Sequence, residues 1–399
     1  MSGLDAARAF VLVIDACGIG ALPDAAAYGD EGTNTLAHLA EAVGGLELPT
    51  LQRLGLGAIL PLRGVAPVQE HAVIGRLHPL GPGKDSIGGH WELMGVVLEA
   101  PLPVYPHGFP PALVARLERA MGREVICNRP DDGLSAIEEF GADHLQSGAL
   151  ILYTSQDSVL QLAAHVERVP VGELYEACAR AREAMSGPDA VGRVIARPFE
   201  GREGAFKRTE GRRDFALAPP WRSYLQELQD AGVPVHGVGK VHDLFAGVGI
   251  SDSHPGATNA RALQSVAELA ASASGPRLVF ANLIETDQVY GHRKDAAGFH
   301  RALREIDAAL GGLLDGLRAG DLLVVTADHG VDPTHPGTDH TREHVPLLAV
   351  TGEMAHGRRL RGGFRHDGPM ADVGATVLRW LTGRGASDPD LPGDSFLAS

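Results

Sequence analysis

Short apolar runs alternate along this chain with segments of helical periodicity. The runs, rich in Val, Leu, Ile and Phe, occupy residues 10–14, 234–238, 278–284, 322–325 and 345–350. In the segment 303–317, by contrast, Leu and Ile recur every three or four residues, as on one face of a helix. Strands that are apolar on both faces are typical of buried parallel sheets. The pattern therefore predicts an α/β fold with a mostly parallel sheet and helices on both faces.

Proline clusters divide this alternation in two places. Five prolines fall between residues 101 and 111, and Pro219 and Pro220 form a second break. Between the breaks lie a further strand pattern at 149–153 and a helical pattern at 174–185. Since 399 residues are too many for one compact core, we predict a core domain of residues 1–99 and 221–399. Residues 100–220 would form a smaller inserted α/β cap domain.

Charge and composition exclude some classes of partner. The formal net charge is -15 and no run of Lys or Arg is present, so we expect no nucleic-acid binding. No apolar run is long enough to span a membrane, and residues 10–14 are too short for a signal-peptide core. The three cysteines are scattered, as expected of reduced thiols. We therefore expect a cytoplasmic protein without a membrane partner.

The segment 83–92, Gly-Lys-Asp-Ser-Ile-Gly-Gly-His-Trp-Glu, has the pattern of a helix start. Asp85 and Ser86 are favoured N-cap residues, and the first turn of a helix presents free N–H groups and a partial positive charge. A hydroxyl at this position can carry a phosphoryl group held by those N–H groups. An ordinary capped helix after a Pro-Gly turn is the alternative interpretation.

Acidic residues and histidines follow several of the predicted strands. Asp15, Asp287 and the pair Asp328-His329 come at strand ends, and His292 and His340 lie nearby in the sequence. Because parallel strands end at one edge of a sheet, these groups should converge there. Taken singly, a strand-end Asp can simply cap the next helix, and any of the 18 histidines can be surface or core. Together, three carboxylates, three imidazoles and a hydroxyl suit a site for two divalent ions.

Several longer motifs carry a resemblance to a known family. They occupy residues 15–20, 84–92, 153–161, 191–199, 290–293, 326–330 and 337–343. On these motifs the chain resembles the phosphopentomutases of the alkaline phosphatase superfamily, nearly from end to end. The resemblance implies an alkaline phosphatase-like core carrying an inserted cap.

The resemblance also implies roles for residues at matching positions. Ser86 would be the phosphorylated nucleophile, where the family usually has Thr, and Ser offers the same chemistry from a less hindered hydroxyl. Asp15, Asp328 and His329 would hold one metal together with the Ser86 oxygen, and Asp287, His292 and His340 the second. The family implies Mn²⁺, which suits mixed carboxylate and imidazole ligands, with Zn²⁺ as the second choice.

Substrate contacts follow from the same resemblance. Around the sugar it suggests Ser155, Asp157, Val159 and Ile195. Around the distal phosphate it suggests Arg193, Arg208 and Lys240, which agrees with the affinity of guanidinium and ammonium groups for phosphate. For the two arginines, ordinary surface solvation is the alternative.

The implied activity is that of an isomerase acting on a small pentose phosphate, with a place in nucleoside salvage. It would interconvert ribose (or 2-deoxyribose) 1-phosphate and 5-phosphate through phospho-Ser86 and a pentose 1,5-bisphosphate, with a pentose or hexose bisphosphate as primer. A cap closing over the site would exclude water. A monomer is favoured.

Three alternatives stay open. A phosphatase or phosphodiesterase on the same core would use water as the acceptor, which the cap and the lack of a secretion signal disfavour. A phosphoglycerate mutase is disfavoured by the motifs at 153–161 and 191–199. A non-catalytic metal-binding or scaffolding protein would be expected to lack some of the six ligands, and all are present.

Overall fold

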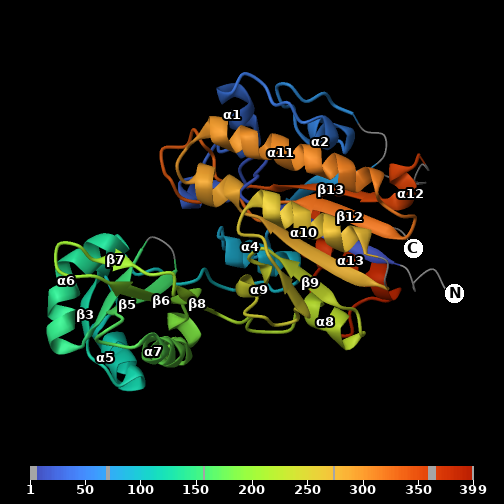
Figure 1. Cartoon of the computed structure of the whole chain (residues 1–399). Helices are drawn as coiled ribbons and strands as arrows, with labels where there is room; N and C mark the ends of the chain where they lie inside the picture. The colour runs from blue at the N-terminus through green and yellow to red at the C-terminus, as the bar shows by residue number, and fades with distance from the viewer. Residues whose placement is uncertain (1–6, 69–71, 156–157, 273–274, 358–364, 398–399) are drawn as a thin grey trace. The chain divides into compact units, whose positions relative to one another are not determined.

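The chain forms two compact units in the computed structural model, which describes residues 7–68, 72–155, 158–272, 275–357 and 365–397 (Figure 1). The core unit comprises Met1–Ala100 and Pro219–Ser399, and the inserted unit comprises Pro101–Ala218. The sequence placed the insertion at residues 100–220. Its action as a cap stays a prediction.

The core unit is built on an eight-stranded sheet in the order β10-β9-β11-β1-β12-β13-β2-β14. The bounds of its strands are β1 Arg8–Ile14, β2 Val73–His78, β9 Val235–Val238, β10 Asp252–His254, β11 Arg277–Leu283, β12 Asp321–Thr326, β13 Val345–Thr351 and β14 Gly368–Pro369. β1 lies between β11 and β12 and is parallel to both, with Val11 opposite Phe280 and Val324. Among the described strands of this sheet, only β13 runs antiparallel to its neighbours, β12 and β2.

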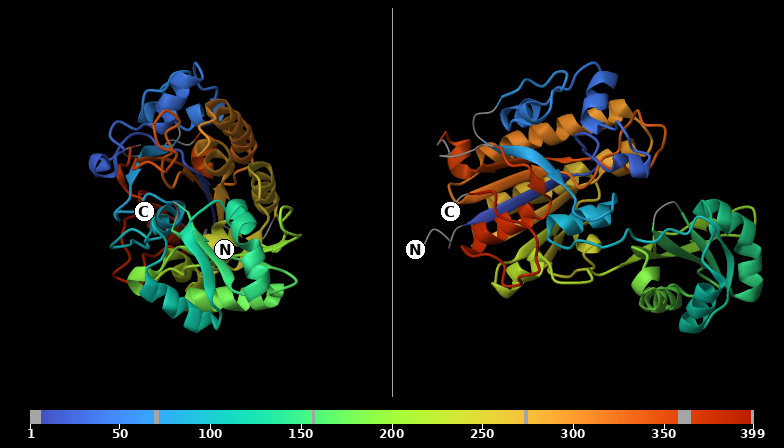
Figure 2. Two further views of the ribbon diagram at one scale, coloured as in Figure 1. Left: turned by 90° about the vertical axis from the view of Figure 1, so that its left-hand side faces the viewer. Right: turned by 180° about the vertical axis from the view of Figure 1, so that it is seen from behind.

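Helices cover both faces of this sheet. The bounds are α1 Thr35–Ala42, α2 Pro49–Arg53, α3 Leu56–Ile59, α4 Ser86–Leu93, α8 Tyr224–Asp230, α9 Val241–Leu244, α10 Asn259–Ala271, α11 Ala296–Asp315, α12 Gly352–Ala355 and α13 Asp372–Thr382. α10 packs against β9, β11 and α11 on one face, whereas α13 packs against β1, β11 and β12 on the other (Figures 1 and 2). Every residue of β1, β11 and β12 is buried, as the uninterrupted apolar runs predicted. The predicted fold class is confirmed.

The inserted unit has its own sheet of six strands. They are β3 Val125–Pro130, β4 Leu150–Thr154, β5 Val159–His165, β6 Arg193–Glu200, β7 Lys207–Arg208 and β8 Arg213–Ala216, in the order β3-β4-β5-β6-β7, with β8 also paired to β6. Its helices are α5 Pro111–Met121, α6 Gly133–Ser147 and α7 Val171–Ala184. α5 and α7 share one apolar cluster with the sheet, and α6 shares a second. The unit thus has apolar cores of its own.

The longest helix among the described residues, α11, has 20 residues, and its exposed side carries Arg301, Arg304 and Glu305. Within the described ranges, no helix combines the length and apolarity needed to cross a bilayer.

Candidate active site

Ser86 is the first residue of α4, as the sequence predicted. The side chain of Asp85 caps the helix by accepting a hydrogen bond from the Gly88 N–H at 3.0 Å. The helix lies directly against the segment that follows β12. A Cβ atom on Gly89 would be only 2.4 Å from the carbonyl oxygen of Asp328, so only glycine fits there without a shift. This close approach places Ser86 Oγ 3.0 Å from His329 Nε2.

The loop that leads into α4 is held by buried polar groups. The carboxylate of Glu92 accepts hydrogen bonds from the Leu80 and Gly81 N–H groups at 2.5 and 2.9 Å. Arg342 donates to the carbonyl of Gly83 at 2.7 Å. Hydrogen bonds therefore hold the loop at residues 80, 81 and 83, just before Ser86.

Asp15, Asp328 and His329 form a candidate metal site, the first metal group, in which one ligand atom from each residue lies within 4.8 Å of the others. Asp15 follows β1, and the Asp328-His329 pair follows the neighbouring parallel strand β12. His329 Nε2 lies 3.4 Å from Asp15 Oδ1 and 3.3 Å from Asp328 Oδ2. The other ring nitrogen, Nδ1, is 3.2 Å from the Gly330 carbonyl. A carbonyl only accepts, so Nδ1 carries the proton and Nε2 presents its lone pair to the group.

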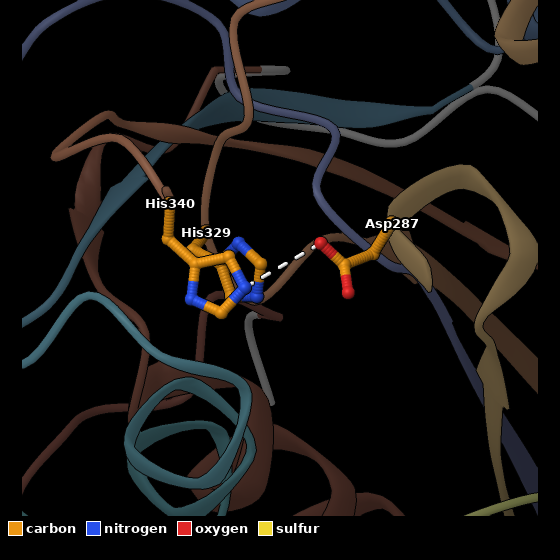
Figure 3. A group of neighbouring side chains, drawn as sticks. All are labelled: Asp287, His329 and His340. Atoms are coloured by element: carbon orange, nitrogen blue, oxygen red, sulfur yellow. Dashed lines mark ion pairs between the residues drawn. The ribbon is translucent and has the colours of Figure 1, made fainter. Parts of the chain in front are cut away.

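Asp287, His329 and His340 form the second metal group (Figure 3). The rings of His329 and His340 lie one over the other, with centroids 4.0 Å apart, and His340 Nε2 is 3.5 Å from Asp287 Oδ1. His292 Nε2 is 3.3 Å from the same oxygen, while its Nδ1 is 2.7 Å from the Thr338 carbonyl. His329 thus belongs to both groups by distance, whereas the resemblance implied it for one metal alone.

Burial and charge set the protonation of these residues. The pKa of Asp15 is raised, first by burial and then by the negative charges of Asp328 and Asp287. Burial opposes the ionisation of Asp287, yet the adjacent imidazoles of His292 and His340 bring its pKa below the usual range. Burial lowers the pKa of His329, which keeps that ring neutral and able to act as a ligand. Three carboxylates in one buried region repel one another, and a positive charge between them would stabilise their ionised forms.

Unsatisfied polar atoms show that the residues present fit metal ions. Four buried ligand atoms make no hydrogen bond to any residue that the structure describes, namely Asp15 Oδ1, Asp287 Oδ1, Asp328 Oδ2 and His340 Nε2. A buried polar atom that lacks a hydrogen bond costs about 1–3 kcal/mol of stability. Four such atoms in one site therefore need a compensating partner. Oxygen and imidazole donors are suitable ligands for Mn²⁺ or Zn²⁺.

Comparisons with known proteins agree with this chemistry. A family model described as the Metalloenzyme superfamily matches residues 7–382. The phosphopentomutase of Caldanaerobacter subterraneus is 47% identical over 372 residues, covering 93% of both chains, and that of Herpetosiphon aurantiacus is 46% identical over 397 residues, covering 99% of both. This chain belongs to the phosphopentomutase family. A solved phosphoglycerate mutase of Leishmania mexicana shares the fold, with a TM-score of 0.50 and 14% identity over 99% of this chain and 98% of that one.

As a member of the phosphopentomutase family, the protein is an isomerase of the phosphotransferase mutase type. Membership of the Metalloenzyme superfamily implies divalent metal ions, for which the first and second metal groups offer ligands.

The predicted substrate contacts lie in both units. In the inserted unit, Val159 is opposite Arg193 and Gln161 opposite Ile195, so strand alternation puts Val159, Arg193 and Ile195 on one face. Arg193 is 3.7 Å from Asp214, and Arg208 on β7 is 3.6 Å from Asp132. Ser155 follows β4. Asp157 lies outside the described residues.

Lys240 belongs to the core unit, at the end of β9. Its Nζ donates to Gln288 Oε1 at 3.1 Å, and its positive charge partly offsets the rise in the pKa of Asp15. The structure therefore places this lysine close to the metal groups.

Two buried residues of the site were not predicted. His90 is fully buried behind Ser86, and Asn282 donates to Asp15 Oδ2 at 2.8 Å. The sequence held a signal for each: His90 lies in the same motif as Ser86, and Asn282 is the one polar residue in the apolar run 278–284.

Proposed function

We propose that this enzyme interconverts ribose (or 2-deoxyribose) 1-phosphate and 5-phosphate through phospho-Ser86 and a pentose 1,5-bisphosphate. The observation that carries the proposal is the position of Ser86 Oγ, at the N-terminus of α4 and 3.0 Å from a residue of both metal groups. The relatives named phosphopentomutase support the choice of a pentose.

The chain's own residues account for the transfer in two steps. In the first, the 5-hydroxyl of a pentose 1-phosphate attacks phospho-Ser86. The new O–P bond forms as the Ser86 Oγ–P bond breaks, and the hydroxyl proton leaves to restore the Ser86 hydroxyl. In the second, Ser86 Oγ attacks the phosphorus of the phosphate on the C1 oxygen. The bond between that phosphorus and the C1 oxygen breaks, and the serine proton passes to the C1 oxygen, which regenerates phospho-Ser86 and releases the 5-phosphate. The first N–H groups of α4 would hold the phosphoryl oxygens throughout.

Divalent ions, when bound, would neutralise charge on the transferring group and lower the pKa of the serine hydroxyl. Asp15, Asp328 and His329 would hold one ion. Asp287, His292 and His340 would hold the other, and Mn²⁺ is proposed for both. A pentose or hexose bisphosphate would supply the first phosphoryl group to Ser86.

The substrate contacts are proposed as the resemblance implies them. Ser155, Asp157, Val159 and Ile195 would contact the sugar, and Arg193, Arg208 and Lys240 the distal phosphate. The inserted unit would act as the cap, in a cytoplasmic monomer.

A phosphorus NMR time course tests the proposal. The protein is supplied with ribose 1-phosphate, Mn²⁺ and a trace of glucose 1,6-bisphosphate. We expect ribose 5-phosphate to accumulate with little inorganic phosphate. Accumulation of inorganic phosphate would instead identify water as the acceptor and overturn the mutase proposal in favour of a phosphatase.

Ser86→Ala should lower turnover roughly 10³-fold or more, because the group that carries the phosphoryl is gone. Its bound metal should stay unchanged. Ser253→Ala, which removes an exposed serine of β10 in the same unit, serves as the matched control and should keep full turnover. Retained turnover in Ser86→Ala would exclude Ser86 as the nucleophile.

A further inference from the structure

We propose that His90 is a positioning residue that aligns the Ser86 helix and two carboxylates of the first metal group, without binding metal or substrate itself. This inference rests on the proposed function for its catalytic consequence, but its geometry stands on the core unit alone.

His90 lies one helical turn after Ser86, with its ring fully buried. Side chains four residues apart lie on the same face of a helix, and they lean toward its N-terminus. The ring therefore points back under Ser86. Its Nδ1 is 2.8 Å from the Ser86 carbonyl oxygen and 3.2 Å from Asp328 Oδ2.

Asn282 connects the other side of the ring to Asp15. Its Nδ2 is 2.8 Å from Asp15 Oδ2 and 3.2 Å from His90 Nε2. Asn282 projects from β11, the parallel neighbour of β1. The chain of contacts thus runs from the nucleophile helix through His90 and Asn282 to the strand end that carries Asp15.

Hydrogen-bonding chemistry allows one arrangement of protons along this chain. Only the amide nitrogen of Asn282 can donate to the Asp15 carboxylate, so its second N–H points to His90 Nε2. Nε2 must then accept, and the ring proton resides on Nδ1. That proton is directed at the Ser86 carbonyl, and Asp328 Oδ2 lies 3.2 Å from the same nitrogen. Each nitrogen of the ring then has a partner.

The arrangement selects which carboxylate oxygens face the metal groups. Asn282 donates a hydrogen bond to Asp15 Oδ2. The other oxygen, Oδ1, lies 3.4 Å from His329 Nε2. Asp328 Oδ1 accepts from the Ala16 and His329 N–H groups at 3.2 Å each, so Oδ2 faces His90 and His329. Without His90, Asn282 loses an acceptor and Asp328 Oδ2 loses the polar group that lies 3.2 Å away. Both carboxylates could then turn away from the orientation that a metal needs.

Partners of this kind, one shell beyond the ligands, typically change metal affinity or activity roughly 10–100-fold when removed. We expect His90→Phe, which keeps the size of the ring, to weaken Mn²⁺ binding at one of two sites by roughly that factor. Equilibrium dialysis of the whole chain without substrate measures this effect. Unchanged Mn²⁺ binding in folded His90→Phe protein would overturn the proposal.

His144 supplies a matched control. It is also a fully buried histidine, with Nδ1 2.6 Å from the Ala149 carbonyl and Nε2 accepting from the His165 N–H at 2.8 Å, but it lies in the inserted unit. We expect His144→Phe to lower thermal stability and to leave the Mn²⁺ dissociation constants unchanged. Equal weakening of Mn²⁺ binding in both variants would show that His90 is merely structural.

A double-mutant cycle tests the route through Asn282. If His90 acts on Asp15 through this amide, His90→Phe should weaken Mn²⁺ binding less in an Asn282→Ala background than in the wild type. Fully additive effects would contradict the route.

Nitrogen NMR of the metal-free wild-type chain needs no variant and covers the case in which His90→Phe does not fold. We expect the His90 ring to carry its proton on Nδ1, and a proton on Nε2 would overturn the proposal. These readouts use no sugar phosphate. Their failure is therefore distinguishable from release of inorganic phosphate in the turnover assay, which concerns the proposed function.

In turnover, His90→Asn should lower kcat while leaving KM near the wild-type value, since the nucleophile is misaligned but the substrate contacts remain. An increase in KM alone would instead identify a substrate-binding role.

Discussion

The core unit and the inserted unit hold their charged groups in opposite ways. In the core unit, Asp15, Asp328 and His329 are 1%, 4% and 3% exposed, and two of their ligand atoms, Asp15 Oδ1 and Asp328 Oδ2, make no hydrogen bond to described residues. In the inserted unit, the side chains of Arg193 and Arg208 are 29% and 35% exposed and stand near Asp214 and Asp132. Buried lone pairs without partners are costly unless a cation completes them, whereas half-exposed ion pairs are weak and exchange partners easily. The first arrangement suits a resident metal, and the second suits a ligand that comes and goes.

Removal of a buried carboxylate should have the largest effect, and it tests most directly whether the core unit holds metal ions. Asp287→Ala leaves His340 and His292 without their shared partner, so we expect bound Mn²⁺ to fall from two equivalents toward one and turnover to be lost. Metal analysis after dialysis measures the change. Asp243→Ala, which removes an exposed carboxylate of the same unit, should keep both equivalents. Two full equivalents in Asp287→Ala would refute the second metal group.

Glu92 is a buried carboxylate whose oxygens already accept hydrogen bonds from peptide N–H groups, so it should affect stability rather than metal binding. Burial raises the pKa of Glu92 to about 7, against the opposing effect of the Leu80 and Gly81 N–H groups. Because the folded state binds this proton more tightly than the unfolded chain does, the stabilisation is complete below about pH 4.5 and is lost as pH rises through about 7.

Glu92→Gln should remove this part of the pH dependence, which amounts to about 3 kcal/mol at most. The measurement is the difference in unfolding free energy between the wild type and the variant, taken at several values from pH 4 to pH 8. A difference that stays constant with pH would contradict the assignment.

Adjacent glycines on α4 sharpen the contrast between tight and open packing. A Cβ atom on Gly89 would meet the Asp328 carbonyl at 2.4 Å, whereas one on Gly88 would meet only Asp85 Oδ2, at 3.4 Å. We expect Gly89→Ala to destabilise the protein by about 1–3 kcal/mol and to weaken Mn²⁺ binding.

Gly88→Ala is the matched control. It should be neutral or stabilise by up to about 1 kcal/mol, because Ala favours the helix. Calorimetric unfolding of both variants provides the test, and equal stability would show that α4 does not need close contact with the end of β12.

The smallest effect is expected from the half-exposed arginines. Arg208→Ala should raise KM roughly tenfold with little change in kcat, since one charge-assisted contact worth about 1.5 kcal/mol is lost. Arg202→Ala, at an exposed position of the same unit, should leave KM unchanged. Steady-state kinetics with ribose 1-phosphate distinguishes the two. A fall in kcat at constant KM would mean that Arg208 stabilises the transition state instead.

Features with a local physical cause could be predicted from the sequence. The apolar run 10–14 became β1, and the Asp85-Ser86 pair became the start of α4, since burial on both faces and N-capping are encoded by neighbouring residues. The strand β2 was missed because its polar residues, Arg76 and His78, interrupt the apolar pattern.

The finer geometry of the site depends on contacts between distant segments. Asp287 was expected at a strand end, but it lies beyond β11 within the π-helical turn Thr286–Gly291, a distortion without a simple sequence signal. The sharing of His329 by two groups, and the contacts of His90 with Asn282, arise only once β1, β11, β12 and α4 are packed together. The direction of β13 was also not predicted.

The central position of β1 has a consequence for the newly made chain. This strand is synthesised before every other strand of its sheet, yet its partners β11 and β12 come more than 260 residues later. At typical rates of synthesis, on the order of tens of seconds pass before those partners exist. During that interval the inserted unit can form its own sheet, while the six apolar residues of β1 lack the strands that bury them. The topology therefore delays the burial of this strand until most of the chain has been made.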